Sequence, residues 1–488
     1  MEIKDLTHIP LWYFFDKINK VPRPSEKESK ITEFIVKFAK KCDLQYKTDN
    51  AGNVLIKKTA TRGMENRKPV ILQSHLDMVC IEVAELKGKI DFDKDAINTY
   101  VENGYVKAKG TTLGADNGIG VAAQLALLAS DDIAHGPVEC LFTTAEETGL
   151  YGAKALDKSY LSGANILLNL DSEDFGEFCI GCAGGRNTQG VFKYKKTVAP
   201  EDYYWFKVKV SGLLGGHSGC QIDLGRGNSI KIITRYLYPF LSQKLLLANI
   251  EGGEKHNAIP NSASAVAGIP KSYKEKAVEW LNILQAAVST ELKKVDKDVK
   301  LTMETIDEPK FCIDYETGNK LLTTLCAIPH GVIGMNHDMK NLVETSTNLA
   351  IIKTDTTKNT VEVLTSQRSS SETMNVEVCN QVYSVLSLGG AKVTGSDGYS
   401  SWKPNKKSNI LKLSTSTYKN LFGKRAAVRA THGGLECGLF LGLNPKLDQV
   451  SFGPTIHNAH TPKEEVEIES VEKFWRFLVE LLKLIPAA

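Results

Sequence analysis

The sequence predicts an α/β fold in which a mainly parallel sheet with flanking helices is interrupted by an inserted α+β domain. Short hydrophobic runs alternate with stretches of helical periodicity in residues 1–186 and again in 399–488, which is typical of parallel sheets covered by helices. In 187–398 this alternation gives way to period-2 strands, such as 204–210, and to long helices. Several hydrophobic runs also end in a histidine or a carboxylate, as at the ligand-binding edge of a parallel sheet.

Length, charge and hydropathy exclude several classes of function. A chain of 488 residues suggests about two to four domains. A net charge of +3 without a block of lysine or arginine argues against a nucleic-acid partner. No run approaches the roughly 18 apolar residues of a membrane span, and the N-terminus does not resemble an export signal. The ten cysteines lack the spacing of a disulfide framework. We therefore expect a cytoplasmic protein with no membrane partner.

The elements of the first domain have recognisable local signals. Ser25 and Glu28 have the spacing of a capping box, and residues 31–38 follow with helical periodicity. Asn103-Gly104 lies between two alternating segments and predicts a β-hairpin. Near the C-terminus, a closing helix is expected over 470–485, which carries an apolar stripe. We expect these C-terminal residues to complete the first domain.

The inserted domain contains a faint internal similarity. An alternating strand, a Gly-rich turn and a helix lie in 204–242, whereas two strands, a helix and a Gly-Gly turn lie in 347–393. This similarity would suit a duplicated, ferredoxin-like module.

Residues with metal-binding or acid–base side chains stand where the predicted elements of the first domain begin or end. They are His75, Asp77, Asp116, Glu146, Glu147 and Asp171. Because ligands bind beyond the carboxyl ends of parallel strands, four segments that are distant in sequence converge on one site. Each acid alone would more often be an ordinary loop acid, helix cap or salt-bridge partner. The joint pattern favours a metal site.

This set of side chains suits two metal ions that share one carboxylate. Three carboxylates and two histidines supply the ligands that two zinc ions need. Glu146 and Glu147 are consecutive and cannot point the same way, so one can bind metal while the other serves as a general base. Asp77 lies two residues past His75, where it can fix the tautomer of the imidazole.

Seven motifs, in order, resemble those of the aminoacyl-histidine dipeptidases. This family, also called Xaa-His dipeptidases or bacterial carnosinases, belongs to the clan of co-catalytic zinc aminoacylases and carboxypeptidases. The resemblance runs from near Pro22 to the C-terminus. Its motifs are Ser74-His-Leu-Asp77-Met-Val, Gly110-Thr-Thr-Leu-Gly-Ala-Asp116-Asn-Gly, Thr144-Ala-Glu-Glu147-Thr-Gly, Asn169-Leu-Asp171-Ser-Glu, Gly215-Gly-His217-Ser-Gly, Thr431-His-Gly-Gly-Leu-Glu-Cys-Gly and Ala459-His460-Thr-Pro.

The resemblance implies a ligand role for each matched residue. It makes Asp116 the bridging ligand of two zinc ions. The other ligands are His75 and Asp171 for one ion, and Glu147 and His460 for the other. Cobalt and manganese are expected substitutes for zinc.

Further roles follow from the same resemblance. Glu146 becomes the general base for a metal-bridging water, and Asp77 orients the first histidine ligand. His217, in the inserted lid, would polarise the scissile carbonyl, although a purely structural role in its Gly-rich turn stays open. Asn257 and Arg368 match lid positions that hold the substrate's backbone and carboxylate.

Smaller details of the site are also expected. His460 stands directly before Thr-Pro, so it is favoured as the ligand over His457, and His432 is left without a role. Clan members commonly hold a cis peptide bond after the bridging aspartate, so we predict a cis Asp116-Asn117 bond.

The resemblance implies a catalytic metallopeptidase domain of 1–186 and 399–488 and a lid or dimerisation domain of 187–398. The expected activity is hydrolysis of Xaa-His dipeptides, including β-alanyl-histidine. An aminoacylase, tripeptidase or carboxypeptidase of the same clan is the alternative, followed by a non-catalytic binding homologue. We expect a homodimer, although a doubled lid could deliver His217 within a single chain.

Overall fold

The structure is a computed structural model that describes residues 3–6 and 9–488. The chain forms two compact units. Unit 1 comprises Met1–Gly181, Trp402–Ala430 and Leu435–Ala488, and unit 2 comprises Cys182–Ser401 and Thr431–Gly434. In the part of the chain that the structure describes, no helix is both long enough and apolar enough to span a membrane.

Unit 1 is built on an eight-stranded sheet with the order β1-β2-β6-β3-β7-β23-β8-β22. Its central strands β6, β3, β7 and β23 are parallel, whereas β1, β2 and β8 join it antiparallel. This arrangement confirms the predicted fold class. The bounds are β1 (Gln45–Thr48), β2 (Val54–Lys58), β3 (Val70–His75), β6 (Val138–Thr143), β7 (Ile166–Asn169), β8 (Glu177–Cys182), β22 (Ala427–Thr431) and β23 (Asp448–Ser451).

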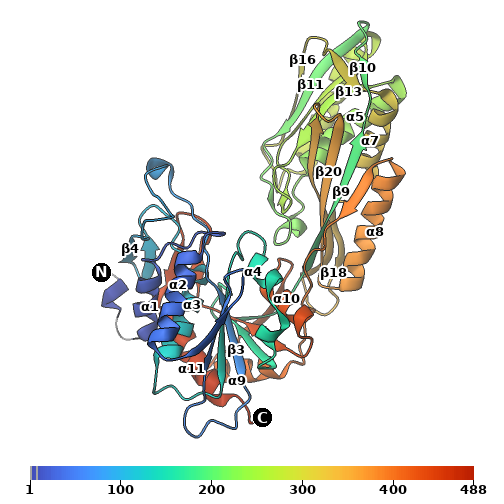
Figure 1. Cartoon of the computed structure of the whole chain (residues 1–488). Helices are drawn as coiled ribbons and strands as arrows, with labels where there is room; N and C mark the ends of the chain where they lie inside the picture. Colours follow the sequence, from blue (N-terminus) through green and yellow to red (C-terminus); the bar gives the residue numbers. More distant parts are fainter. Residues whose placement is uncertain (1–2, 7–8) are drawn as a thin grey trace. The chain divides into compact units, whose positions relative to one another are not determined.

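Helices lie on both sides of this sheet (Figure 1). Every residue of β3 and β6 is buried, as expected for parallel strands that are covered on both faces. On the sheet, α3 packs against β3 and is itself covered by α1, while α9 packs against β23 and α11. The helices are α1 (Pro10–Ile18), α2 (Ser29–Lys41), α3 (Ala115–Ala129), α4 (Tyr151–Ala155), α9 (Asn409–Phe422), α10 (Glu436–Leu443) and α11 (Ile468–Leu484).

A smaller sheet of unit 1 has the order β24-β25-β5-β4. Its strands β4 (Thr99–Glu102) and β5 (Tyr105–Ala108) form the predicted hairpin, and both Asn103 and Gly104 have positive φ. Strands β24 (Ile456–His457) and β25 (Glu465–Glu467) pair beside β5. The C-terminal segment therefore completes unit 1 by supplying β24 and β25 to this sheet and β22 and β23 to the large one.

The predicted capping box is wrong. Helix α2 begins at Ser29, and no side chain caps its N-terminus. The Ser25 hydroxyl instead donates a hydrogen bond to Asp77 Oδ2 at 2.8 Å. Glu28 Oε1 accepts hydrogen bonds from the backbone N–H groups of Glu26 and Ala145, at 2.8 and 2.9 Å. The side chains of Ser25 and Glu28, which the local pattern assigned to the helix cap, thus form tertiary hydrogen bonds instead.

Unit 2 contains a nine-stranded antiparallel sheet that is built from two similar modules. Each module has the order strand, helix, strand, strand, helix, strand along the chain, which supports the predicted ferredoxin-like duplication. The first consists of β11 (Tyr203–Ser211), α5 (Ser229–Leu237), β13 (Leu246–Gly252), β15 (Ala263–Pro270), α6 (Lys274–Glu291) and β16 (Lys300–Thr305). The second consists of β9 (Gly184–Lys193), α7 (Tyr315–Ala327), β19 (Val343–Asp355), β20 (Thr360–Ser369), α8 (Glu372–Leu388) and β21 (Lys392–Gly395).

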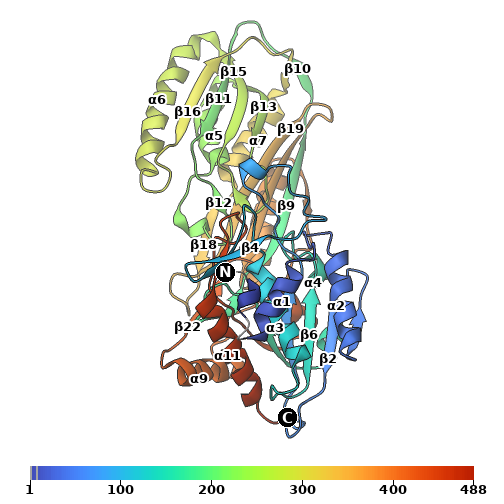
Figure 2. The same ribbon diagram turned by 90° about the vertical axis from the view of Figure 1, so that its left-hand side faces the viewer.

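The two modules meet edge to edge through their second strands. The sheet order is β16-β11-β15-β13-β19-β20-β9-β21, so each half has the order 4-1-3-2 counted from its outer edge. The ninth strand, β18 (Gly331–Met335), lies off this path and pairs with β19. The joint is the antiparallel pair Glu251↔Lys353 and Gly252↔Ile352. The four helices pack on the strands and in a row on one another, in the order α6, α5, α7 and α8 (Figures 1 and 2). The first module is inserted within the second, after β9.

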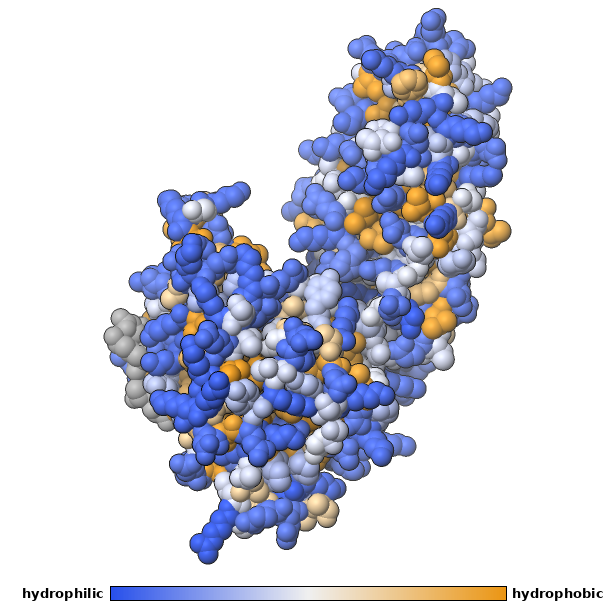
Figure 3. Space-filling view, in the orientation of Figure 1, coloured by the Kyte–Doolittle hydropathy of each residue, from blue (hydrophilic) through white to orange (hydrophobic). Residues whose placement is uncertain are grey.

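Hydrophobic side chains of both units are concentrated in their cores. The core of unit 2 combines residues of both modules, including Phe206, Tyr236 and Leu322. In the face that Figure 3 displays, hydrophilic residues predominate and hydrophobic ones form only small, scattered groups.

Candidate active site

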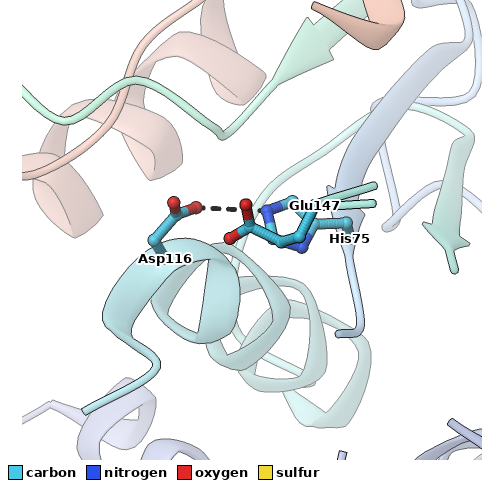
Figure 4. Close-up of side chains that lie close together, drawn as sticks. All are labelled: His75, Asp116 and Glu147. Atoms are coloured by element: carbon cyan, nitrogen blue, oxygen red, sulfur yellow. Dashed lines mark hydrogen bonds and ion pairs between the residues drawn. The ribbon is translucent and has the colours of Figure 1, made fainter. Parts of the chain in front are cut away.

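The ends of the central parallel strands bring the predicted metal ligands of unit 1 together. His75 is the last residue of β3, and Asp171 lies two residues beyond β7. Asp116 is in the first turn of α3, and Glu147 follows the end of β6. His460 lies in the turn between β24 and β25. Figure 4 shows the side chains of His75, Asp116 and Glu147 facing one another.

Asp116 lies between two histidine–carboxylate pairs. Its Oδ1 atom is 3.1 Å from His75 Nε2, which is also 3.3 Å from Asp171 Oδ1. Its Oδ2 atom is 3.0 Å from His460 Nε2, which is also 2.9 Å from Glu147 Oε1. Each oxygen of Asp116 therefore faces a different histidine and carboxylate. The peptide bond from Asp116 to Asn117 is cis, as the sequence analysis predicted.

The charges of these side chains depend strongly on one another. Burial alone would lower the pKa of His75, but Asp171 and Asp116 raise it well above its usual value. Hydrogen bonds to Asp116 and Glu147 raise the pKa of His460 to about 11. Burial would raise the pKa of Asp116, but hydrogen bonds from both histidines lower it below its usual value. In the protein alone, the protonated imidazoles of His75 and His460 thus balance the negative charges of the carboxylates.

This donor set fits divalent metal ions. Ligand atoms of His75, Asp116 and Glu147 all lie within 4.8 Å of one another. Imidazole nitrogens together with carboxylate oxygens are typical zinc ligands, whereas magnesium and calcium prefer oxygen alone. A cation at each histidine–carboxylate pair would replace a proton as the positive charge.

Asp77 connects the first histidine to the turn that carries the two glutamates. His75 Nδ1 is 3.1 Å from the backbone oxygen of Asp77 and 3.4 Å from its Oδ1. The same carboxylate accepts hydrogen bonds from the backbone N–H groups of Glu146 and Glu147, at 3.1 and 3.2 Å. Ala145, at the start of this turn, has a φ of 48°. Burial raises the pKa of Glu146 well above its usual value, and that of Glu147 to about 7.

Two further carboxyl groups, the buried Glu436 and the half-buried Glu173, lie near the metal-binding residues. Burial raises the pKa of Glu436 to about 8, and its Oε2 atom accepts hydrogen bonds from Gln73 Nε2 and Thr143 Oγ1. Burial also raises the pKa of Glu173 to about 8, with Asp116 as the next cause. Sequence analysis gave neither residue a role, although both stand inside the quoted motifs.

The residues that the sequence analysis assigned to the lid lie in unit 2. His217 and Asn257 are on neighbouring segments, because β12 (Gly216–His217) pairs with β14 (Ala258–Ile259). His217 Nδ1 accepts hydrogen bonds from the backbone N–H groups of Gly219 and Cys220, at 3.2 and 3.1 Å. An imidazole that accepts hydrogen bonds at Nδ1 carries its N–H group on Nε2.

Arg368, on β20, is buried and donates a hydrogen bond from Nη1 to the Tyr399 hydroxyl at 2.7 Å. Among the residues that the structure describes, no carboxylate forms an ion pair with its guanidinium. His432 is also buried in unit 2, and its Nε2 atom is 2.7 Å from Ser346 Oγ. Burial lowers the pKa of His432 to about 3, so this imidazole is neutral.

Comparison with known proteins identifies the family. The model of peptidase family M20/M25/M40 matches residues 71–484. The cytosol non-specific dipeptidase of Escherichia coli is 40% identical over 487 residues, which cover 100% of this chain and 99% of that protein.

Solved structures agree with this result. The aminoacylhistidine dipeptidase from Vibrio alginolyticus has 40% sequence identity and a TM-score of 0.88, covering 100% of this chain and 99% of that one. A tripeptidase from Staphylococcus aureus shares the fold at 16% identity, with a TM-score of 0.55 and 98% of each chain covered. With most of its length matched by the family model and a full-length relative at 40% identity, the chain belongs to peptidase family M20/M25/M40.

Proposed function

We propose that this protein is a metal-dependent dipeptidase that hydrolyses Xaa-His dipeptides, including β-alanyl-histidine. The observation that carries the proposal is the placement of Asp116 between two histidine–carboxylate pairs. A further glutamate, Glu146, directly precedes Glu147, and its backbone N–H donates to Asp77. The full-length relatives, which are named as a cytosolic dipeptidase and an aminoacylhistidine dipeptidase, support the same class of substrate.

In this proposal His75 and Asp171 would hold one zinc ion, and Glu147 and His460 would hold the other, with Asp116 shared between the two. Cobalt or manganese would be substitutes for zinc. Zinc at such a site supplies a Lewis acid for the scissile carbonyl and a nucleophile generated from water at neutral pH.

Two further residues of unit 1 transfer a proton or orient other groups of the site. Glu146 takes the proton of the nucleophilic water and returns it to the leaving amine. Asp77 keeps the first histidine ligand oriented through its Nδ1 atom, and it fixes the glutamate turn by accepting two backbone N–H groups.

Unit 2 is proposed to act as the lid that binds the substrate. His217 donates from Nε2 to the developing oxyanion, a role that its two Nδ1 hydrogen bonds support. Arg368, buried without a carboxylate partner among the described residues, suits the carboxylate of the C-terminal residue. Asn257 would hold the substrate backbone.

The homodimer expected from the sequence remains a prediction. In unit 2, the second strands of both modules are already paired within one chain. This internal pairing supports the alternative in which one chain supplies its own His217. Light scattering coupled to size-exclusion chromatography would distinguish a monomer from a dimer. A cytoplasmic location is proposed from the cytosolic relative.

The test of the proposed function is release of free histidine from β-alanyl-histidine and alanyl-histidine by the zinc-loaded protein. A Glu146→Gln variant and an N-acetyl amino acid serve as the enzyme and substrate controls. Histidine release that requires Glu146 would support the dipeptidase. Cleavage of the acetylated substrate alone would identify an aminoacylase, and no turnover by a zinc-loaded protein would leave a binding homologue.

A further inference from the structure

Two buried charged residues outside the set of metal ligands hold the segment that carries Asp116. The carboxylate of Glu464 accepts four backbone N–H groups, two on each oxygen. Its Oε2 atom is 2.8 Å from Leu113 N and 3.0 Å from Gly114 N. Its Oε1 atom is 2.7 Å from Ala115 N and 3.4 Å from Asp116 N. Glu464 is only 3% exposed.

This carboxylate binds backbone N–H groups that lie ahead of the regular part of α3. Asp116 and Asn117 do not have helical φ and ψ, and Gly114 has no side chain that could accept a hydrogen bond. Buried backbone N–H groups need hydrogen-bond partners. Glu464 supplies these partners from about 350 residues further along the chain, so the backbone of 113–116 depends on a tertiary contact.

Arg23 holds the same segment from the other side. Its Nη2 atom donates to Gly114 O at 2.5 Å, while Nη1 donates to Leu76 O and Asp77 O, both at 3.2 Å. One guanidinium thus joins the segment after His75 to the segment before Asp116. It is 2% exposed, and it lies outside residues 71–484, which the family model matches.

Arg23 can approach the backbone this closely only because residue 114 is a glycine. Gly114 has a φ of 70°, and a Cβ atom built on it would lie 2.4 Å from Arg23 Nη2. The peptide groups of Gly114 are therefore bound on both sides, its N–H by Glu464 and its C=O by Arg23.

We propose that Arg23 and Glu464 are positioning residues of the metal centre. They fix the segment 113–116 so that Asp116 presents one carboxylate oxygen to each histidine before any metal binds. Glu464 lies four residues after His460, and its backbone N–H donates to Thr461 O at 3.0 Å. It therefore links Asp116 to the turn that carries His460, whereas Arg23 links Asp116 to the segment that follows His75.

This inference rests on the proposed metal site. It predicts that each of the two residues mainly affects the binding of a different zinc ion. In Glu464→Gln, one acceptor oxygen becomes an amide N–H₂ group that faces two N–H donors. We expect zinc affinity to fall at least about tenfold, in the range known for residues that orient ligands. The larger loss should affect the zinc ion that His460 binds. Arg23→Met should mainly weaken the ion that His75 binds.

The experiment is a stepwise zinc titration of the metal-free protein against a competing chelator. His75→Ala and His460→Ala identify which binding step belongs to which histidine. The matched control is Glu139→Gln, because Glu139 is also buried in unit 1 but pairs with Lys57 on neighbouring strands of the sheet. In the double variant Arg23→Met/Glu464→Gln, losses should be less than additive, since both residues act through one segment.

A second measurement does not depend on metal or on activity. Hydrogen–deuterium exchange of a peptide spanning 111–118 should be faster in metal-free Glu464→Gln and Arg23→Met than in Glu139→Gln. Unchanged exchange together with wild-type zinc affinities would overturn the inference. A wild-type protein that binds no zinc would instead overturn the proposed function, whereas the exchange result would still decide whether these residues fix the segment. If Arg23→Met does not fold, Arg23→Lys replaces it.

Discussion

The two halves of the candidate metal centre differ in how the fold supports them. We call His75 with Asp171 the inner half and His460 with Glu147 the outer half. The His75 side chain is 1% exposed and ends a central strand, whereas the His460 side chain is 48% exposed and lies in a turn, at a φ of 62°. Asp77 contacts the second ring nitrogen of His75.

The parallel sheet therefore places both ligands of the inner half, but only Glu147 of the outer half. In the described residues, no comparable partner orients the second ring nitrogen of His460. The outer half depends instead on a turn that is held at Glu464. We therefore expect one tightly held and one more exchangeable zinc ion.

Removing the shared carboxylate should abolish both halves together. Asp116→Ala is expected to lose both zinc ions and to reduce kcat/KM at least about 1000-fold, equivalent to about 4 kcal/mol of transition-state stabilisation. Metal analysis after dialysis and steady-state kinetics measure the two effects. Retention of two zinc ions by the variant would show that Asp116 is not shared.

Glu146 belongs to neither half, so its replacement should separate chemistry from metal binding. Glu146→Gln should lower kcat about 100- to 10,000-fold, as expected for loss of a general base. Both zinc affinities should change little in the same titration. A large loss of metal would instead make Glu146 a ligand.

The two histidine variants test the asymmetry directly. His75→Ala should lose the tightly held zinc ion, and His460→Ala should lose the exchangeable one. Titration with a competing chelator should therefore leave a single binding step in each variant, weak in the first and strong in the second. Equal remaining affinities would contradict the difference between the halves.

Asp77→Asn should sharpen the comparison further. The substitution removes a charge beside His75, so zinc affinity of the inner half should fall about 10- to 100-fold. The outer half should lose less, because an amide oxygen can still accept one N–H group of the glutamate turn. An equal loss in both halves would indicate that Asp77 acts mainly through that turn.

The smallest expected effect is a pH dependence of the metal-free protein. The pKa of Glu147 is raised to about 7 and that of His460 to about 11, so the folded state holds protons that the unfolded chain releases. Stability should therefore fall as the pH rises from about 5 to 8. We expect a decrease in Tm of about 2 °C or more, measured by calorimetry with a chelator present. Saturating zinc should stabilise more at pH 8 than at pH 5, and Glu147→Gln should flatten the profile below pH 7.

The strand ends that carry the inner half could be predicted from the sequence because each ligand follows a buried hydrophobic run. His75 at the end of β3 and Asp171 after β7 are examples of this local signal. The cis bond and the choice of His460 came from the family resemblance rather than from periodicity. Helix α1 is not among the elements that the sequence analysis predicted.

Residues that support the site through distant backbone groups could not be predicted. Glu464 is defined by four N–H donors that are about 350 residues away, so no spacing in its own segment indicates its partners. Ser25 and Glu28 had a plausible local interpretation as a helix cap, and tertiary contacts replaced it. The insertion of one module of unit 2 within the other was also hidden, because β9 is separated from the rest of its module by the whole first module.

During synthesis, the two modules of unit 2 become able to fold at different times. The first module is continuous along the chain, so its strands can pair as soon as β16 has emerged from the ribosome. β9 is synthesised earlier, but it pairs with β20 and β21. It therefore stays unpaired while the whole first module is translated. Unpaired strands promote aggregation. Once folded, the first module presents β13 as an edge strand, with which β19 of the second module can pair.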